Sequence, residues 1–92
     1  MANAPALYLA YEATGEVAEG APGPWDDLVV LRPGLLLVDS DAGRSRVYHA
    51  LKRLLPAETP LLVAPLADAP KMAHMAPGTT AWVRAREASV GG

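Results

Sequence analysis

Two carboxylates with a hydroxyl between them are the first residues in the chain whose types and spacing can do chemistry. Asp39, Ser40 and Asp41 directly follow an apolar run and precede a helical pattern, so they are expected at the carboxyl edge of a sheet, where α/β proteins commonly bind ligands. Carboxylates there can hold Mg²⁺ together with a phosphate. The same side chains can instead cap the following helix, and we favour that interpretation. Asp39 and Asp41 are the candidate metal ligands.

A second group of residues is basic. Four Lys or Arg residues and one histidine lie between positions 44 and 53 with no acidic residue among them: Arg44, Arg46, His49, Lys52 and Arg53. The spacing i, i+3, i+7 places Arg46, His49 and Arg53 on one stripe of a helix. A solvated helix face is the simpler interpretation, and a stripe that binds an anion or an acidic partner is the functional one. A net charge of −2 and an aromatic content of 5% argue against nucleic acid.

Two further groups of residues are candidates for catalysis or metal binding. Met72, His74 and Met75 form a soft set that suits Cu(I), but we favour methionines that fill a core beside an exposed histidine. Ser40, Ser45 and Ser89 lack the surroundings of a nucleophile elbow. The chain has no cysteine and therefore no thiolate nucleophile. The sequence thus favours a non-catalytic protein without a cofactor.

The first third of the chain predicts a strand, a loop and a hairpin. Residues 7–11 are apolar and aromatic, as in a strand. Residues 14–24 are rich in Gly and Pro and predict a loop, which the ring of Trp25 would close against the body of the domain. Residues 28–31 and 35–38 are short β-compatible runs on either side of Arg32-Pro33-Gly34, so we expect a hairpin whose connection is tight or bulged.

The rest of the chain predicts helices and two more strands. Apolar residues at helical spacing from 47 to 55 indicate an amphipathic helix that starts after Asp41 and ends at Pro56. Residues 61–64 predict a strand. Because a helix connects it to the strand at 35–38, we expect these two strands to pair in parallel. Asp68 can cap a helical turn over 69–75. Alternation over 79–86 predicts an edge strand, with a helix over 81–88 as the alternative.

These elements define an α+β fold. We expect a small mixed sheet of four to five strands with one long amphipathic helix, in the order strand, hairpin, helix, strand, short helix, strand. The length of 92 residues suits a single domain over 1–92, with the Gly/Pro loop at 14–24 and a flexible tail at 87–92. A hydrophobic fraction of 51% is typical of a globular protein.

The chain ends in Gly91-Gly92, and this terminus resembles that of ubiquitin-like sulfur carriers. The resemblance covers the last two residues and, loosely, the order of elements. It implies that the carboxylate of Gly92 is adenylated and converted to a thiocarboxylate by a partner enzyme, because residues without side chains can thread a narrow channel. The first strand and the Gly/Pro loop depart from the family, whose members usually begin with their hairpin.

Function and assembly follow by elimination. We expect a small non-catalytic interaction module that acts through self-association and a protein partner, with the sulfur carrier and the Asp39/Asp41 phosphate site as alternatives.

Residues 1–27 carry five acidic groups and no basic one, while residues 28–92 carry eight basic and five acidic groups. One helix covers only one face of a sheet that is apolar on both faces, so we expect a homodimer or a larger oligomer. The lack of a basic leader and of a 20-residue apolar span predicts a soluble cytoplasmic protein. The abundance of Ala, Gly, Pro and Arg implies the codon bias of a GC-rich genome, which predicts a bacterial source.

Overall fold

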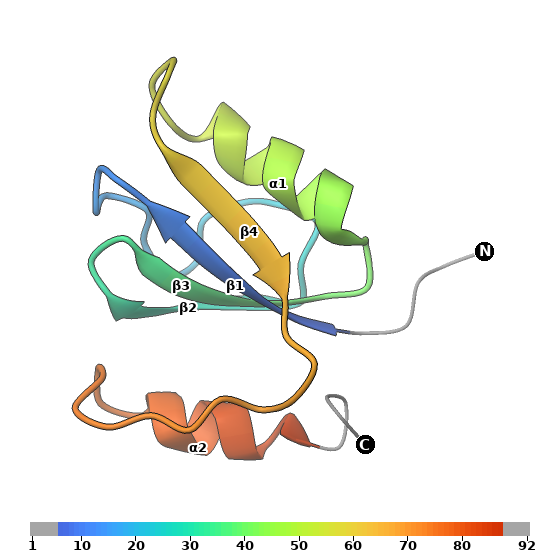
Figure 1. Cartoon of the computed structure of the whole chain (residues 1–92), viewed down its shortest axis with the longest axis vertical. Coiled ribbons are helices and arrows are strands. Elements are labelled where there is room, and N and C mark those ends of the chain that lie inside the picture. Colours follow the sequence, from blue (N-terminus) through green and yellow to red (C-terminus); the bar gives the residue numbers. More distant parts are fainter. Residues whose placement is uncertain (1–5, 88–92) are drawn as a thin grey trace.

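The computed structural model describes residues 6–87 and confirms the α+β class (Figure 1). Four strands, one long helix and one short helix follow each other in the order β1 (Ala6–Glu12), β2 (Asp27–Arg32), β3 (Leu35–Ser40), α1 (Arg44–Arg53), β4 (Leu61–Pro65) and α2 (Thr79–Arg84).

The four strands form one sheet in the order β2-β3-β1-β4, and every neighbouring pair is antiparallel. Strands β3 and β4 run in the same direction, as a crossover through α1 requires. They do not pair, however, because β1 lies between them, so the predicted parallel pairing is wrong. Leu7 and Ala10 are fully buried from opposite faces of β1, and a strand that is apolar on both faces is most stable in the centre of a sheet.

The hairpin of β2 and β3 forms as expected, with an irregularity in register between Val30 and Arg32. Gly34 in its turn has a φ of 86°, which a residue with a side chain rarely adopts. A Cβ added at Gly34 would lie 2.5 Å from the carbonyl oxygen of Glu12. The N–H of Glu12 donates to the carbonyl of Gly34 at 2.9 Å, so this close approach ties the hairpin turn to the end of β1.

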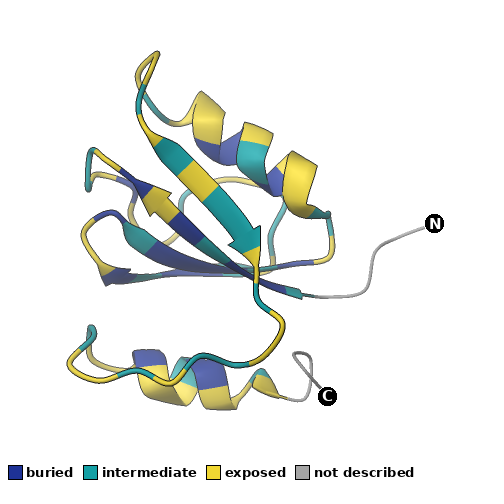
Figure 2. Cartoon of the chain, in the orientation of Figure 1, coloured by how far each residue is buried: buried dark blue, intermediate teal, exposed yellow. Residues whose placement is uncertain are grey.

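Helix α1 and the Gly/Pro loop cover the first face of the sheet (Figure 2). Val47 and Leu51 of α1 pack with Val17 of the loop over side chains from β1, β2 and β3. Trp25 closes the loop as predicted: its ring packs against this cluster, and its Nε1 donates to the carbonyl of Ala21 at 2.9 Å.

The second face is covered by the segment 66–78 and by α2. Val83 of α2 is buried with Val29, Leu31 and Leu37 of the sheet. The reason for expecting a homodimer, a second face left bare by a single helix, is therefore wrong: the chain covers much of that face itself. The homodimer stays a prediction without that support.

Two predicted elements of the second layer are wrong. Residues 79–86 do not form an edge strand. The alternative of a helix is correct in type, but α2 spans Thr79–Arg84 and not 81–88. Thr79 and Val83, four residues apart, are both buried, which is a helical period rather than a strand period. Residues 69–75 form no helical turn and follow an irregular path on which Met72 and Met75 pack toward the sheet.

The predicted capping of α1 by Asp39, Ser40 and Asp41 is also wrong. The N-cap is Gly43, and no side chain makes a capping hydrogen bond. Strand β3 continues through Ser40, which leaves the three residues too early in the chain to reach the first N–H groups of α1. The hydroxyl of Ser40 instead donates to the carbonyl of Pro24 at 2.5 Å and accepts from the N–H of Ala42 at 3.0 Å.

Candidate functional site

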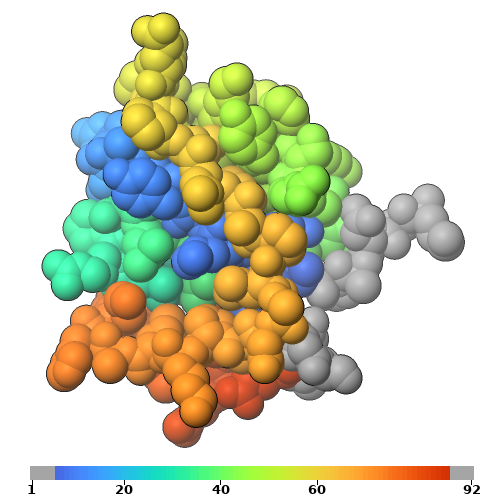
Figure 3. Space-filling view, in the orientation of Figure 1, coloured from blue at the N-terminus to red at the C-terminus, as the bar shows by residue number. Residues whose placement is uncertain are grey.

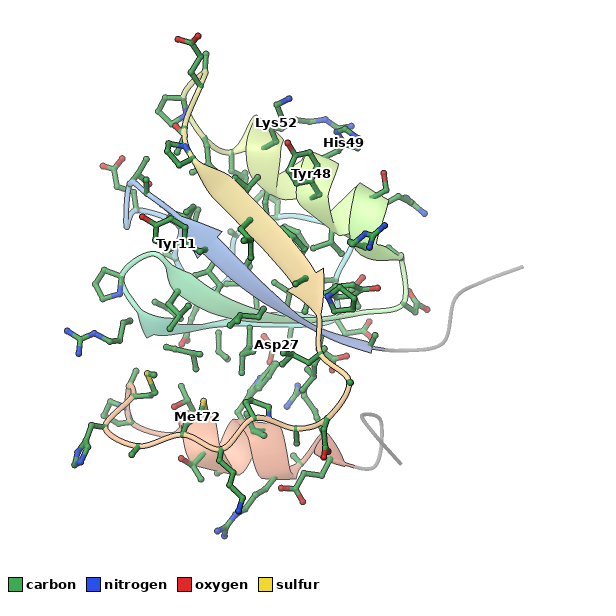
Figure 4. All side chains as sticks on the ribbon, viewed as in Figure 1. Tyr11, Asp27, Tyr48, His49, Lys52 and Met72 are labelled. Carbon is green, nitrogen blue, oxygen red and sulfur yellow. The ribbon has the colours of Figure 1, made fainter. Side chains whose placement is uncertain are left out.

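The five basic candidates of α1 all lie at the surface of the molecule. Helix α1 buries Val47, Ala50 and Leu51 against the sheet and turns its other sides to solvent. The exposed residues are Ser45 and the five candidates Arg44, Arg46, His49, Lys52 and Arg53. All five predicted site residues therefore lie on the surface of one helix. His49 and Lys52 are labelled in Figure 4.

The exposed surface of α1 divides into two stripes. Arg46, His49 and Arg53 form the loop-side stripe, which shares a shallow hollow of about 280 Å³ with Pro24 of the Gly/Pro loop. This stripe has the membership that the spacing predicted.

The second stripe was not predicted as a unit. Arg44, Tyr48 and Lys52, each four residues after the last, form the β4-side stripe. Arg44 and Tyr48 line a hollow of about 240 Å³ together with Val63 of β4. Lys52 and Tyr48 line a second hollow, of about 330 Å³, together with Glu58 and with Leu61 at the start of β4. The two hollows share Tyr48 and run along the seam between α1 and β4.

Tyr48 sits at the centre of the polar side chains of the β4-side stripe (Figure 4). Its ring makes an edge-on contact with the ring of His49, with the centroids 5.1 Å apart. The Nζ atom of Lys52 lies 5.9 Å from the centroid of the Tyr48 ring, within the range of a weak cation–π interaction. Tyr48 therefore connects the two stripes.

None of the basic side chains of α1 forms an ion pair within residues 6–87. Both ion pairs in this part of the chain are made by Arg86, with Asp27 and Asp39. Lys52 and Arg53 in the last turn of α1 are favoured by the helix dipole, which is negative there. Arg44 and Arg46 lie in the first turn, where the dipole is positive and no acidic residue is present. The dipole opposes these two charges, so it offers no structural reason for them.

Asp39 and Asp41, the candidate metal ligands, lie in different surroundings. Asp39 Oδ2 accepts a hydrogen bond from Arg86 Nε at 2.8 Å, and Asp41 is exposed beyond the end of β3. Within residues 6–87, no group of three histidine or carboxylate side chains is placed to hold a metal ion.

The methionine and histidine set is also divided. Met72 and Met75 pack toward the second face of the sheet, whereas His74 is exposed, with a φ of 61°. This is the core-filling arrangement that the sequence offered as the alternative to a Cu(I) site. Of the three serines, Ser40 is held by backbone partners and Ser45 is exposed on α1. Ser89 and the Gly91-Gly92 terminus lie outside the described residues.

A set of four side chains that no sequence pattern indicated holds α2 to the sheet, and we call it the clasp: Arg86, Trp82, Asp27 and Asp39. The guanidinium of Arg86 bonds to both carboxylates and lies 3.8 Å from the centroid of the Trp82 ring. Trp82 Nε1 donates to Asp27 Oδ2 at 2.8 Å. The separation of four residues between Trp82 and Arg86 was the available signal, but it has this meaning only in a helix.

Glu12 was missed as well. Glu12 is only 1% exposed, yet its carboxylate accepts hydrogen bonds from three donors. Oε1 accepts from the Thr14 hydroxyl at 2.6 Å and from the Gly15 N–H at 2.7 Å, and Oε2 accepts from the Val17 N–H at 2.9 Å. Burial alone raises the pKa of Glu12, but these hydrogen bonds outweigh it and hold the pKa below its ordinary value. The charge organises the start of the Gly/Pro loop.

The chain matches no protein-family model, no curated protein and no solved structure. Within residues 6–87, neither helix combines the length and the apolar character needed to cross a bilayer.

Proposed function

We propose that the protein is a non-catalytic interaction module that binds an acidic partner protein through the exposed surface of α1. The observation that carries this proposal is the set of five basic or histidine side chains on one helix without an ion-pair partner within residues 6–87. Arg32, Lys71 and Arg84 also lack an ion-pair partner within residues 6–87, but they lie apart on different segments, whereas the side chains of α1 share one helix.

The arrangement of α1 within the domain also supports a binding role. The helix is held at its base by Val47 and Leu51, both fully buried, so its outer side chains project from a fixed backbone. A partner that meets such a surface loses little free energy to ordering the backbone of the site. Arg44 and Arg46 gain nothing from the helix dipole, and an acidic partner would supply the charge that the first turn lacks.

The proposal predicts that reversing the charges of the loop-side stripe weakens partner capture. In the variant Arg46→Glu/Arg53→Glu, we expect at least a tenfold loss of captured partner at low salt, because both charges change from attraction to repulsion. The difference from wild type should shrink as salt is added and screens both interactions. The measurement is a pull-down from an extract of the producing cells, quantified by mass spectrometry.

The matched control is Arg32→Glu/Arg84→Glu, which makes the same change in net charge at two exposed arginines outside α1. We expect this variant to capture the partner as wild type does. Equal loss in both variants would mean that net charge alone governs capture, and no loss in the α1 variant would leave its basic surface a solvated face.

A further inference from the structure

We infer that the partner docks as an extended acidic segment along the outer edge of β4, in the groove between β4 and the β4-side stripe of α1. This inference rests on the proposed function and specifies how the partner binds. The segment would add a fifth strand to the sheet, a recognition mode in which main-chain hydrogen bonds supply affinity and alternate side chains supply specificity.

The outer edge of β4 offers free main-chain groups. In residues 6–87 the sheet ends at β4, and no strand pairs with its outer side. The N–H of Leu66 donates to Leu7, and the N–H of Ala13 donates to Pro60. Because inward and outward groups alternate along an antiparallel strand, Leu61 and Val63 turn their N–H and carbonyl groups outward. Pro65 adds only a carbonyl, so the free edge is two donors long.

Helix α1 forms one side of the groove, and its length matches that of β4. Helix α1 packs beside β4 (Figures 1 and 3), and the two hollows between them are lined by the β4-side stripe, Val63 and Leu61. The five residues of β4 extend about 17 Å at roughly 3.3 Å per residue. The ten residues of α1 extend about 15 Å at roughly 1.5 Å per residue. A segment of five or six extended residues fits beside both.

The two faces of the added strand would meet different chemistry. On the α1 side stand Arg44 and Lys52, with Tyr48 between them, and Glu58 lines the hollow beside Lys52. The two cations outnumber this one carboxylate and favour acidic side chains. On the opposite face lies Leu62, which is 54% exposed beside its cross-strand partner Tyr11, itself 47% exposed. Apolar side chains there would cover these two residues. The site therefore selects a segment in which acidic and apolar residues alternate.

A second copy of this chain fits the edge less well. Pairing of β4 with β4 about a two-fold axis would bring the β4-side stripes of both copies, each with Arg44 and Lys52, toward one another. Like charges that are brought close together oppose association. Charge complementarity thus favours an acidic segment over self-pairing.

The test is a titration of the isotope-labelled chain with the capped hexapeptide (Val-Glu)₃, followed by NMR and by amide hydrogen exchange. We expect shifts and slowed exchange at the amides of Leu61 and Val63. The matched peptides are (Val-Lys)₃ and Val₃-Glu₃, which change the charge and the period, and we expect both to bind at least tenfold more weakly. Equal binding of Val₃-Glu₃, or an effect that spares both amides, overturns the inference. Sedimentation of the free chain as a dimer with these amides already protected also overturns it, in favour of self-pairing.

A protein variant and a modified peptide test the hydrogen bonds separately. Val63→Pro removes one outward donor without touching the bonds to β1, and we expect at least a tenfold loss of (Val-Glu)₃ affinity. Since that variant can also disturb folding, the wild-type chain is tested with (Val-Glu)₃ N-methylated either at every valine or at every glutamate. One series blocks the edge that faces β4 and should lose binding, while the other should retain it. Equal affinity of the two series overturns strand pairing.

The outcome also separates this inference from the proposed function. If capture in cell extract depends on Arg46 and Arg53 but (Val-Glu)₃ leaves β4 unchanged, the interaction module stands and the docking mode is wrong. If (Val-Glu)₃ binds at β4 but capture ignores the loop-side stripe, the groove is a binding site and the proposed use of that stripe is wrong.

Discussion

Replacing Arg86 by methionine is expected to lower the free energy of unfolding by about 2 kcal/mol. Asp27 and Asp39 are direct partners across β2 and β3, so without the guanidinium two carboxylates would face each other with no cation between them. Methionine keeps the apolar contact with the Trp82 ring and removes the charge. The side chain of Arg86 is 22% exposed, which keeps the expected loss below that of a fully buried ion pair.

Urea unfolding followed by circular dichroism measures this loss. The control is Arg84→Met, because Arg84 belongs to the same helix but is exposed, and its removal should change the free energy of unfolding by no more than about 0.5 kcal/mol. Equal stability of the two variants would show that the clasp contributes nothing beyond the packing of α2.

The sequence predicted best where the structure depends on local signals. Arg32-Pro33-Gly34 between two apolar runs specified the hairpin, and apolar residues at helical spacing specified α1. In both cases the residues that determine the element lie within it. The position of β1 between β3 and β4 is a non-local choice, set by how completely each strand can be buried, and the spacing of residues along the chain does not contain it.

The prediction of 79–86 as a strand failed because alternation and helical spacing overlap in a short segment. Trp82 and Arg86 satisfy both periods. In the structure they bond together to the sheet, and that contact depends on Asp27, which lies 55 residues before Trp82. Asp39 was misread as a helix cap for the same reason, since its partner Arg86 is 47 residues away.

The candidate site was predicted in composition but not in arrangement. Every basic residue chosen from the sequence lies exposed on α1, yet the division into two stripes depends on what stands beside the helix. The groove needs Val63 and Leu61 from β4, and no motif links them to Arg44 or Lys52. Such a site becomes visible only once the helix and the edge strand are placed next to each other.

Replacing Glu12 by glutamine is expected to lower the free energy of unfolding by about 3 kcal/mol at neutral pH. Both oxygens of the Glu12 carboxylate accept hydrogen bonds, from donors at Thr14, Gly15 and Val17. An amide has only one oxygen, so its NH₂ group must face at least one of these donors. A buried N–H without an acceptor costs more than an exposed one, because water does not replace the lost bond.

The loss in Glu12→Gln should depend on pH in a defined direction. The pKa of Glu12 in the folded chain lies below its ordinary value of 4.5, so the stabilisation by the carboxylate is complete above about that pH and disappears as the pH falls through the folded value. The difference in unfolding free energy between wild type and Glu12→Gln should therefore be constant near neutrality and shrink below about pH 4.5. Urea unfolding of both proteins over this range measures it. Glu16→Gln, which alters an exposed carboxylate of the same loop, should stay within about 0.5 kcal/mol of wild type throughout. A difference for Glu12→Gln that is independent of pH would mean that the side chain acts through its shape and not through its charge.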